Sequence, residues 1–147
     1  MGIRWRSWLL SGLLAGLVIS VSGTVLAHAV LGPEYVAAFR SHTAGPAPPL
    51  PAIIAQNLSL RFLYGLLGLF FYVGFRPRFG PGPGTALLAG AALAAGTYLP
   101  ALVHLHQFGI LTGAKLWIAA AWGLGEAMTA CLLGAWLYRE APPTPCR

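Results

Sequence analysis

Two charged side chains, Arg61 and Glu126, lie within long apolar segments of the sequence. A charge at the centre of a bilayer costs about 2.5–3.5 kcal/mol on insertion scales, so neither is expected there without a partner or a role. Arg61 precedes Arg76 by fifteen residues, or roughly 22 Å along a helix. Glu126 precedes Arg139 by thirteen, or roughly 20 Å. An intramembrane salt bridge is therefore available if the two helices are neighbours.

Other polar side chains share helix faces with these charges. Asn57, Arg61 and Tyr64 have the spacing i, i+4, i+7, which puts them on one face. The predicted intramembrane polar site comprises Arg61, Glu126, Asn57, Tyr64, Thr129 and Tyr98. Two interpretations stay open: a proton or substrate site of a carrier or channel, or a buried ion pair that fixes which helices pack together.

Four histidines form the second set of residues that could do chemistry. His28, His104 and His106 fall at the ends of apolar segments, on one expected side of a membrane. His42 lies in the connecting segment on that same side. Such imidazoles could bind zinc or copper, or ligate a haem. His104 and His106 point to opposite faces of a helix, and the only acidic residue nearby is Glu34. We therefore expect no cofactor, with a haem or metal ion at these histidines as the alternative.

The chain lacks the motifs of common enzyme classes. It has no CxxC pair, and no aspartate from which a Ser-His-Asp set could be assembled. Prolines alternate with glycines over residues 80–84, which removes the amide donors that a phosphate-binding loop needs. Cys131 and Cys146 are too far apart on a helical segment for a disulfide. We expect a non-enzymatic protein.

The elements that position these residues follow from composition. The chain has 147 residues, of which 57% are hydrophobic and 8% charged, whereas soluble domains carry about 25% charged residues. This composition excludes a soluble enzyme, a disordered chain and a disulfide scaffold. Apolar runs at about 7–30, 52–75, 85–103 and 116–138 each suit a bilayer core. We predict an all-α fold, a transmembrane four-helix bundle in a single domain.

The connecting segments are rich in proline and glycine. We expect an irregular loop over residues 31–51 and a stiff, non-helical turn over residues 76–84 that ends the second span. A short loop is expected over residues 104–115, and a disordered cytoplasmic tail over residues 141–147. Pro100 should loosen the third helix.

Basic residues predict the orientation of the bundle. One side of a four-span arrangement carries Arg4, Arg6, Arg76, Arg78, Arg139 and Arg147. The other side carries Arg40 and Lys115. The positive-inside rule then places both termini in the cytoplasm. As an alternative, Ala27-His28-Ala29 could be the cleavage site of a signal peptide, although the preceding apolar run is longer than usual.

Small residues repeat along the spans. The sequence Leu13-Leu14-Ala15-Gly16 recurs as Leu87-Leu88-Ala89-Gly90, which suggests two repeated helical hairpins. Faces of small residues let helix backbones approach closely in lipid. Such faces lie at Gly12 and Gly16, and at Gly123, Ala127, Ala130 and Gly134. We expect them to pack the bundle internally rather than to form a dimer interface.

The turn over residues 76–86 and the ending over residues 134–140 resemble a group of uncharacterised small bacterial four-span integral membrane proteins. The resemblance implies a four-helix architecture and a bacterial inner membrane. It implies no activity, and no functional residue carries over from it.

Three hypotheses for function follow. The first is an accessory or oligomer-forming membrane subunit, in contact with the lipid bilayer and with no nucleic acid. Its partner would be a second copy or a larger membrane complex. The second is a small carrier or channel with a polar site at Arg61 and Glu126. The third is a haem- or metal-binding membrane protein that uses the histidines.

Overall fold

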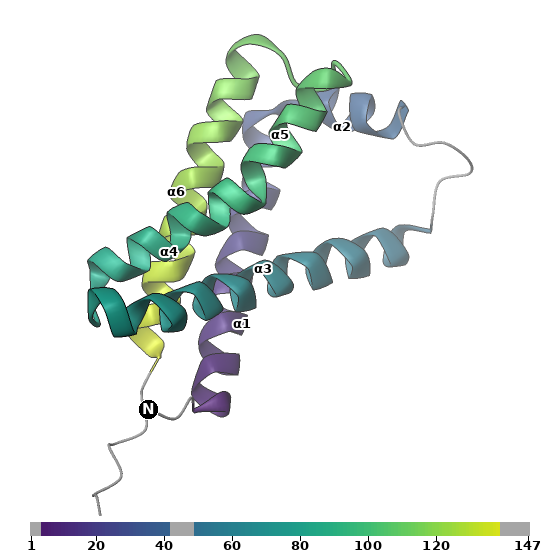
Figure 1. Ribbon diagram of the computed structural model, residues 1–147. Coiled ribbons are helices and arrows are strands. Elements are labelled where there is room, and N and C mark those ends of the chain that lie inside the picture. Colours follow the sequence, from purple (N-terminus) through teal and green to yellow (C-terminus); the bar gives the residue numbers. More distant parts are fainter. Residues whose placement is uncertain (1–3, 42–48, 139–147) are drawn as a thin grey trace, which may run out of the picture.

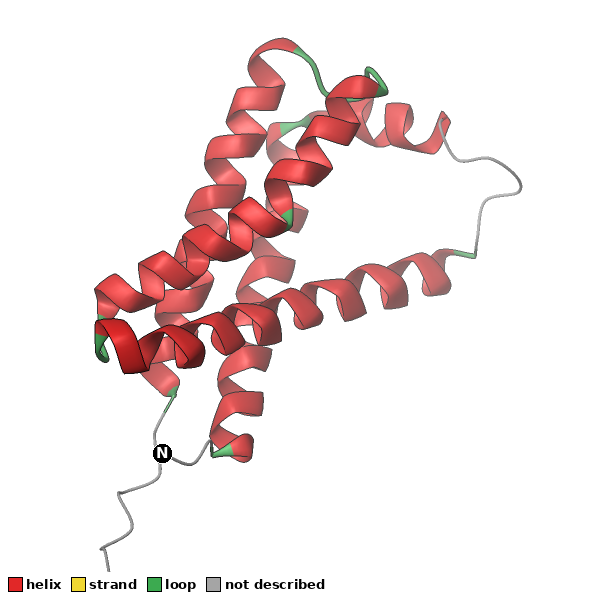
Figure 2. Cartoon of the chain, in the orientation of Figure 1, coloured by secondary structure: helices red, strands yellow, loops and turns green. Residues whose placement is uncertain are grey.

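The computed structural model describes residues 4–41 and 49–138, apart from the side chain of Phe39. These residues form helices joined by short turns, without a strand among them (Figure 2). The helices are α1 (Trp5–Val25), α2 (Gly32–Ser41), α3 (Leu50–Phe79), α4 (Pro83–Gly96), α5 (Tyr98–Gln107) and α6 (Gly113–Leu137). A π-helical turn, η1 (Leu26–Val30), continues α1. The predicted all-α fold is confirmed.

Four helical segments are long and apolar enough to cross a membrane. They are Trp5–Val30, Leu50–Phe79, Pro83–Gln107 and Gly113–Leu137. A helix satisfies its backbone hydrogen bonds internally, as a segment surrounded by lipid requires. The chain therefore has the architecture of a multi-pass membrane protein.

Helices α1, α4–α5 and α6 run between the two ends of the bundle, whereas α3 lies across α1 (Figure 1). One end, called here the α2 end, carries α2 and the α5–α6 connection, while the start of α3 projects from the side of the bundle. The opposite end, called here the Arg76 end, carries the start of α1, the α3–α4 turn and the end of α6. Helix α1 packs against α3 and α6, while α4 packs against α6 and α3.

The first half of helix α3 projects away from the bundle. Figure 1 shows it crossing α1 and diverging from the other helices as it approaches Leu50. Every residue from 51 to 60 is exposed, whichever side of the helix it lies on. Only the second half of α3 contributes to the buried core, through Gly65, Gly68, Leu69 and Tyr72. The first half of α3 is thus unpacked all round, and Arg61 stands where the packed half begins.

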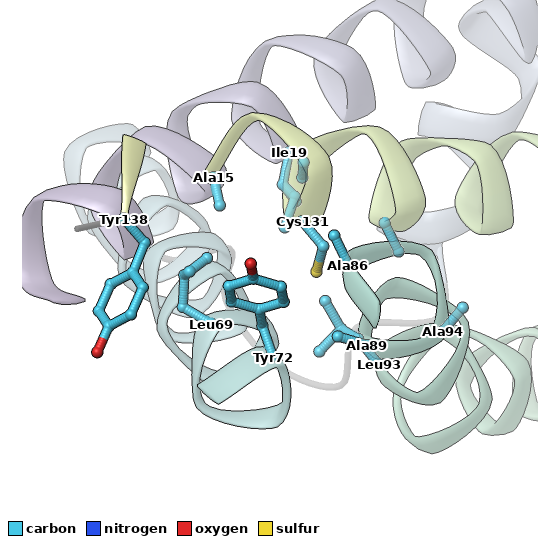
Figure 3. Packing of buried hydrophobic residues seen from close by; sticks show 12 residues of the cluster. Ala15, Ile19, Leu69, Tyr72, Ala86, Ala89, Leu93, Ala94, Cys131 and Tyr138 are labelled. Carbon is cyan, nitrogen blue, oxygen red and sulfur yellow. The ribbon is translucent and has the colours of Figure 1, made fainter. Parts of the chain in front are cut away.

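The core is small and rich in alanine, which brings helix backbones close together (Figure 3). A Cβ on Gly16 would lie 2.7 Å from the Cα of Phe62, and one on Gly90 would lie 2.5 Å from the Cα of Met128. Neither glycine could carry a side chain without moving a neighbouring helix. The predicted small-residue faces therefore pack the bundle internally.

The third span is broken at Thr97, as the position of Pro100 predicts. Thr97 has φ −124° and ψ −60°, and it separates α4 from α5. Pro100 has no N–H to donate to the preceding turn, so a continuous helix would lose a hydrogen bond there. The break redirects the chain immediately before Tyr98.

Three predicted connections are wrong in part. Residues 32–41 form α2 rather than an irregular loop, because Pro33 is tolerated at a helix start and Glu34 and Arg40 match the helix dipole. Helix α3 continues through Pro77 to Phe79, and the amide of Gly80 still donates to the Arg76 carbonyl. Helix α5 continues to Gln107 instead of ending near residue 103.

Two other predictions concern residues outside the part that the structure describes. These are the tail over residues 141–147, and His42 in the segment between α2 and α3. The basic residues Arg139 and Arg147 also lie outside that part.

Candidate functional site

Glu126 is a buried acid near the middle of α6. Its side chain is only 6% exposed. Carboxylate oxygen Oε1 accepts a hydrogen bond from the Tyr98 hydroxyl at 2.5 Å. Oxygen Oε2 is buried and has no hydrogen-bond partner among the described residues. A fully ionised carboxylate in this position would be poorly compensated, since one tyrosine hydroxyl does not replace its hydration shell.

Arg61 is half-buried and held by the backbone of α1. Its Nη1 donates to the Ile19 carbonyl at 2.7 Å. That carbonyl belongs to the helical ladder of α1, so Arg61 shares it. Gly23, one turn further along α1, leaves the space for the guanidinium, because a Cβ on Gly23 would collide with Arg61.

The two charges do not form an ion pair in this structure. Within the described residues, an ion pair joins Lys115 and Glu34. Arg61 instead binds the Ile19 carbonyl, and Glu126 binds the Tyr98 hydroxyl. Tyr98 is close enough to interact with both charges. Its hydroxyl binds Glu126, and it is also within electrostatic reach of Arg61. The predicted salt bridge is therefore not formed, and the Tyr98 hydroxyl rather than Arg61 binds the Glu126 carboxylate.

Tyr64 completes this arrangement from α3. Its ring centroid lies 6.0 Å from that of Tyr98, with the two planes tilted. The structure thus brings together four of the six residues predicted for the polar site: Arg61, Tyr64, Tyr98 and Glu126. These four residues are called here the Arg61–Glu126 cluster.

The other two predicted residues lie apart. Thr129 is exposed and donates to the Gly125 carbonyl of its own helix. Asn57 is exposed and donates to the Ile53 carbonyl, one turn from Arg61 on the unpacked half of α3. Asn57 therefore flanks the Arg61–Glu126 cluster, while Thr129 is exposed and bonds within its own helix.

Sequence reasoning missed two contributions from α1. The Trp122 indole donates to the Ser22 hydroxyl at 2.8 Å, which ties α6 to α1 beside Glu126. The Ile19 carbonyl accepts from Arg61. A backbone acceptor leaves no mark in the residue types, but Ser22 and Gly23 stand out as small residues on α1.

The histidines are not brought together as a metal site. His28, His104 and His106 are all exposed, and His106 contacts the Leu111 carbonyl through Nδ1 at 3.2 Å. Across residues 4–41 and 49–138, no three His, Cys or acidic side chains are grouped as a metal ion would require. The haem or metal hypothesis draws no support from this arrangement.

A separate polar contact closes the α2 end. Lys115 of α6 binds the Glu34 carboxylate at 2.8 Å, beside a surface pocket of about 200 Å³. This contact with Lys115 lowers the pKa of Glu34 below its ordinary value. Burial raises the pKa of Tyr35, which lines the same pocket and lies within reach of Arg61. The ion pair therefore links α2 to α6 at the surface of the bundle.

The cluster can hold one proton and one positive charge inside the bundle. Glu126 has an open acceptor oxygen, and Arg61 has donors beyond the one bonded to α1.

No protein-family model, curated protein or solved structure matches this chain.

Proposed function

We propose that the protein is a small membrane carrier whose cycle is linked to protonation of Glu126. The observation that carries this proposal is the buried, unpartnered Oε2 of Glu126 inside a bundle of apolar helices. Ionisable residues at such positions mark ion and proton pathways more often than they do in soluble proteins.

The position of Arg61 supports a cycle rather than a static registry pair. A permanent structural ion pair would hold Arg61 and Glu126 together, whereas each now binds a different group. Deprotonation of Glu126 would leave a buried charge that Arg61 could neutralise. Because Arg61 lies at the start of the packed half of α3, such pairing would draw the unpacked half towards α1 and α5.

Labelling by dicyclohexylcarbodiimide, an apolar reagent that modifies protonated carboxyl groups, tests this proposal. The protein in liposomes should gain one adduct at Glu126, located by mass spectrometry, and the yield should fall as the pH rises. Because a carrier exposes its site to both sides, a change of pH on either side of the membrane should alter the yield.

Two controls make the labelling specific. Glu126→Gln should remove the adduct, while exposed Glu34 should still react with a water-soluble carbodiimide. Labelling that is independent of pH, or that responds to the pH on one side only, would contradict a carrier.

Assembly is a second candidate function, and the exposure of residues 51–60 favours it. Ala52, Ala55, Gln56 and Ser59 share the face of α3 opposite Arg61. In lipid, small residues allow close approach and amide side chains hydrogen-bond across helices. We infer that a second copy covers this face, with Gln56 pairing with its counterpart.

Disulfide cross-linking tests the assembly. Ser59→Cys should give a covalent dimer in native membranes on mild oxidation, while Leu87→Cys, exposed on α4, should not. Equal cross-linking of both variants would contradict a specific interface at α3.

The distribution of basic residues supports a location. Arg4, Arg6, Arg76 and Arg78 all lie at the Arg76 end of the bundle. By the positive-inside rule, this end and both termini face the cytoplasm of a bacterial inner membrane.

A further inference from the structure

The charge balance of the Arg61–Glu126 cluster limits which substrates a carrier could move. When Glu126 is ionised and Arg61 is charged, the cluster is neutral overall. When Glu126 takes up a proton, the cluster carries one uncompensated positive charge in a region of low dielectric. Such a charge is strongly disfavoured unless a counter-charge binds with it.

Arg61 is placed to receive that counter-charge. Its hydrogen bond to Ile19 uses Nη1, and the described part of the chain provides no hydrogen-bond partner for Nε or Nη2. A guanidinium presents its donors as a planar fork that matches a carboxylate. Towards the start of α3, the same face of the helix carries the Asn57 amide and exposed Ile54, at the spacing i, i+3, i+7 with Arg61.

We propose that the cluster binds one small monocarboxylate at Arg61 together with one proton at Glu126, so that the carrier performs electroneutral symport. This inference rests on the proposed carrier function and names its substrate class. The carboxylate is held by Arg61 with the Asn57 amide beside it, and the aliphatic body lies along Ile54.

Coupling follows from the charges of the four loading states. The empty cluster, with Arg61 positive and Glu126 negative, is neutral, and so is the cluster loaded with both anion and proton. The proton alone leaves one positive charge, and the anion alone leaves one negative charge. Low dielectric penalises both half-loaded states, so proton and anion bind and cross together.

Within the described residues, the titratable side chains around the cluster are tyrosines. Tyr98 faces Glu126 from α5, Tyr64 faces Tyr98 from α3, and Tyr35 faces Arg61 from α2. An ordinary phenol is neutral at neutral pH. Helix α1 contributes the Ile19 carbonyl and the Ser22 hydroxyl, and α4 contains no ionisable side chain.

Proton uptake on addition of sodium lactate tests the inference directly. The purified protein in detergent, in weakly buffered solution, should take up one proton for each lactate bound at a pH where Glu126 is ionised. Equilibrium dialysis with labelled lactate measures the bound anion, and a pH indicator measures the proton. Sodium chloride at equal ionic strength is the blank.

Three variants give distinct expected results. Arg61→Gln should weaken lactate binding by about 30-fold or more, since it removes one partner of a buried charged pair. Glu126→Gln mimics the protonated acid, so it should bind lactate without proton uptake and with an affinity independent of pH. Arg78→Gln, on an exposed residue at the opposite end, should behave as the unchanged protein.

Several results would overturn the inference. These are lactate binding without proton uptake in the unchanged protein, equal binding by Arg61→Gln, and proton release on addition of tetraethylammonium chloride, which would indicate cation exchange. If Arg61→Gln does not yield monodisperse protein, Arg61→Lys keeps the charge and should retain weaker, proton-coupled binding. Carbodiimide labelling of Glu126 without any lactate effect would refute the substrate class and leave the carrier proposal standing.

Discussion

At the scale of single residues, the account depends on how two charges are accommodated among apolar helices. Arg61 reaches a backbone carbonyl of α1, and Glu126 reaches one tyrosine hydroxyl. Both contacts depend on small or aromatic neighbours that the chain places beside them. Gly23 is the clearest case, because its missing side chain is the space in which the Arg61 guanidinium lies.

Substitution Gly23→Ala is therefore expected to displace the Arg61 guanidinium and break its bond to Ile19. A hydrogen bond to a charged group contributes about 1.5–3 kcal/mol, so the free energy of unfolding should fall by an amount of that order. Equilibrium unfolding in SDS measures it. Gly74→Ala is the matched control, since nothing lies within 4 Å of a Cβ there, and it should stabilise α3 by up to about 1 kcal/mol. Equal shifts for the two variants would contradict the contact.

Most residues of the polar site could be predicted from the sequence. Arg61 and Glu126 stand out because charge is so rare in the apolar runs, and Tyr64 follows from helical spacing. The acceptor at Ile19 could not be predicted, because every residue of α1 offers an identical carbonyl. Which carbonyl is used depends on the crossing of α1 and α3, which residue types do not encode.

At the scale of elements, the unequal packing of α3 separates a rigid half from an unpacked half. The second half packs through Gly65 and Gly68 against α1, α4 and α6, while residues 51–60 are all exposed. The spans themselves were predictable from hydropathy and length. Helix α2 was not, because the prolines that surround it suggested a loop, although Pro33 stands at a position where helices begin.

Helix α2 is expected to loosen from the bundle in acid. Lys115 lowers the pKa of Glu34, so the ion pair stabilises the attachment above the ordinary glutamate pKa of about 4.3. That contribution is lost as the pH falls through the lowered pKa. Hydrogen–deuterium exchange of residues 32–41, relative to the intrinsic rates, should therefore accelerate as the pH falls through this lowered pKa. In Glu34→Gln the exchange should be fast already at neutral pH, and unchanged exchange in that variant would show that the pair does not hold α2.

At the scale of the whole molecule, an alternation of four spans puts the polar cluster inside the bundle and most basic residues at one end. By the positive-inside rule, we expect the Arg76 end to face the cytoplasm. Single cysteines introduced at Gly84, near the Arg76 end, and at Thr112, near the α2 end, report it. With an impermeant maleimide applied to intact cells or spheroplasts, Thr112→Cys should react and Gly84→Cys should react only after lysis. The reverse pattern would contradict the positive-inside orientation.

The central claim is that Glu126 is a titrating acid inside the membrane, and infrared difference spectroscopy tests it most directly. The chain has only three acidic side chains, so a carboxylic-acid band can be assigned by one substitution. The account predicts a protonated-carboxyl band that disappears reversibly as the pH rises and that is missing in Glu126→Gln. A band that persists in Glu126→Gln, or a Glu126 that stays ionised at every pH at which the protein is folded, would contradict it.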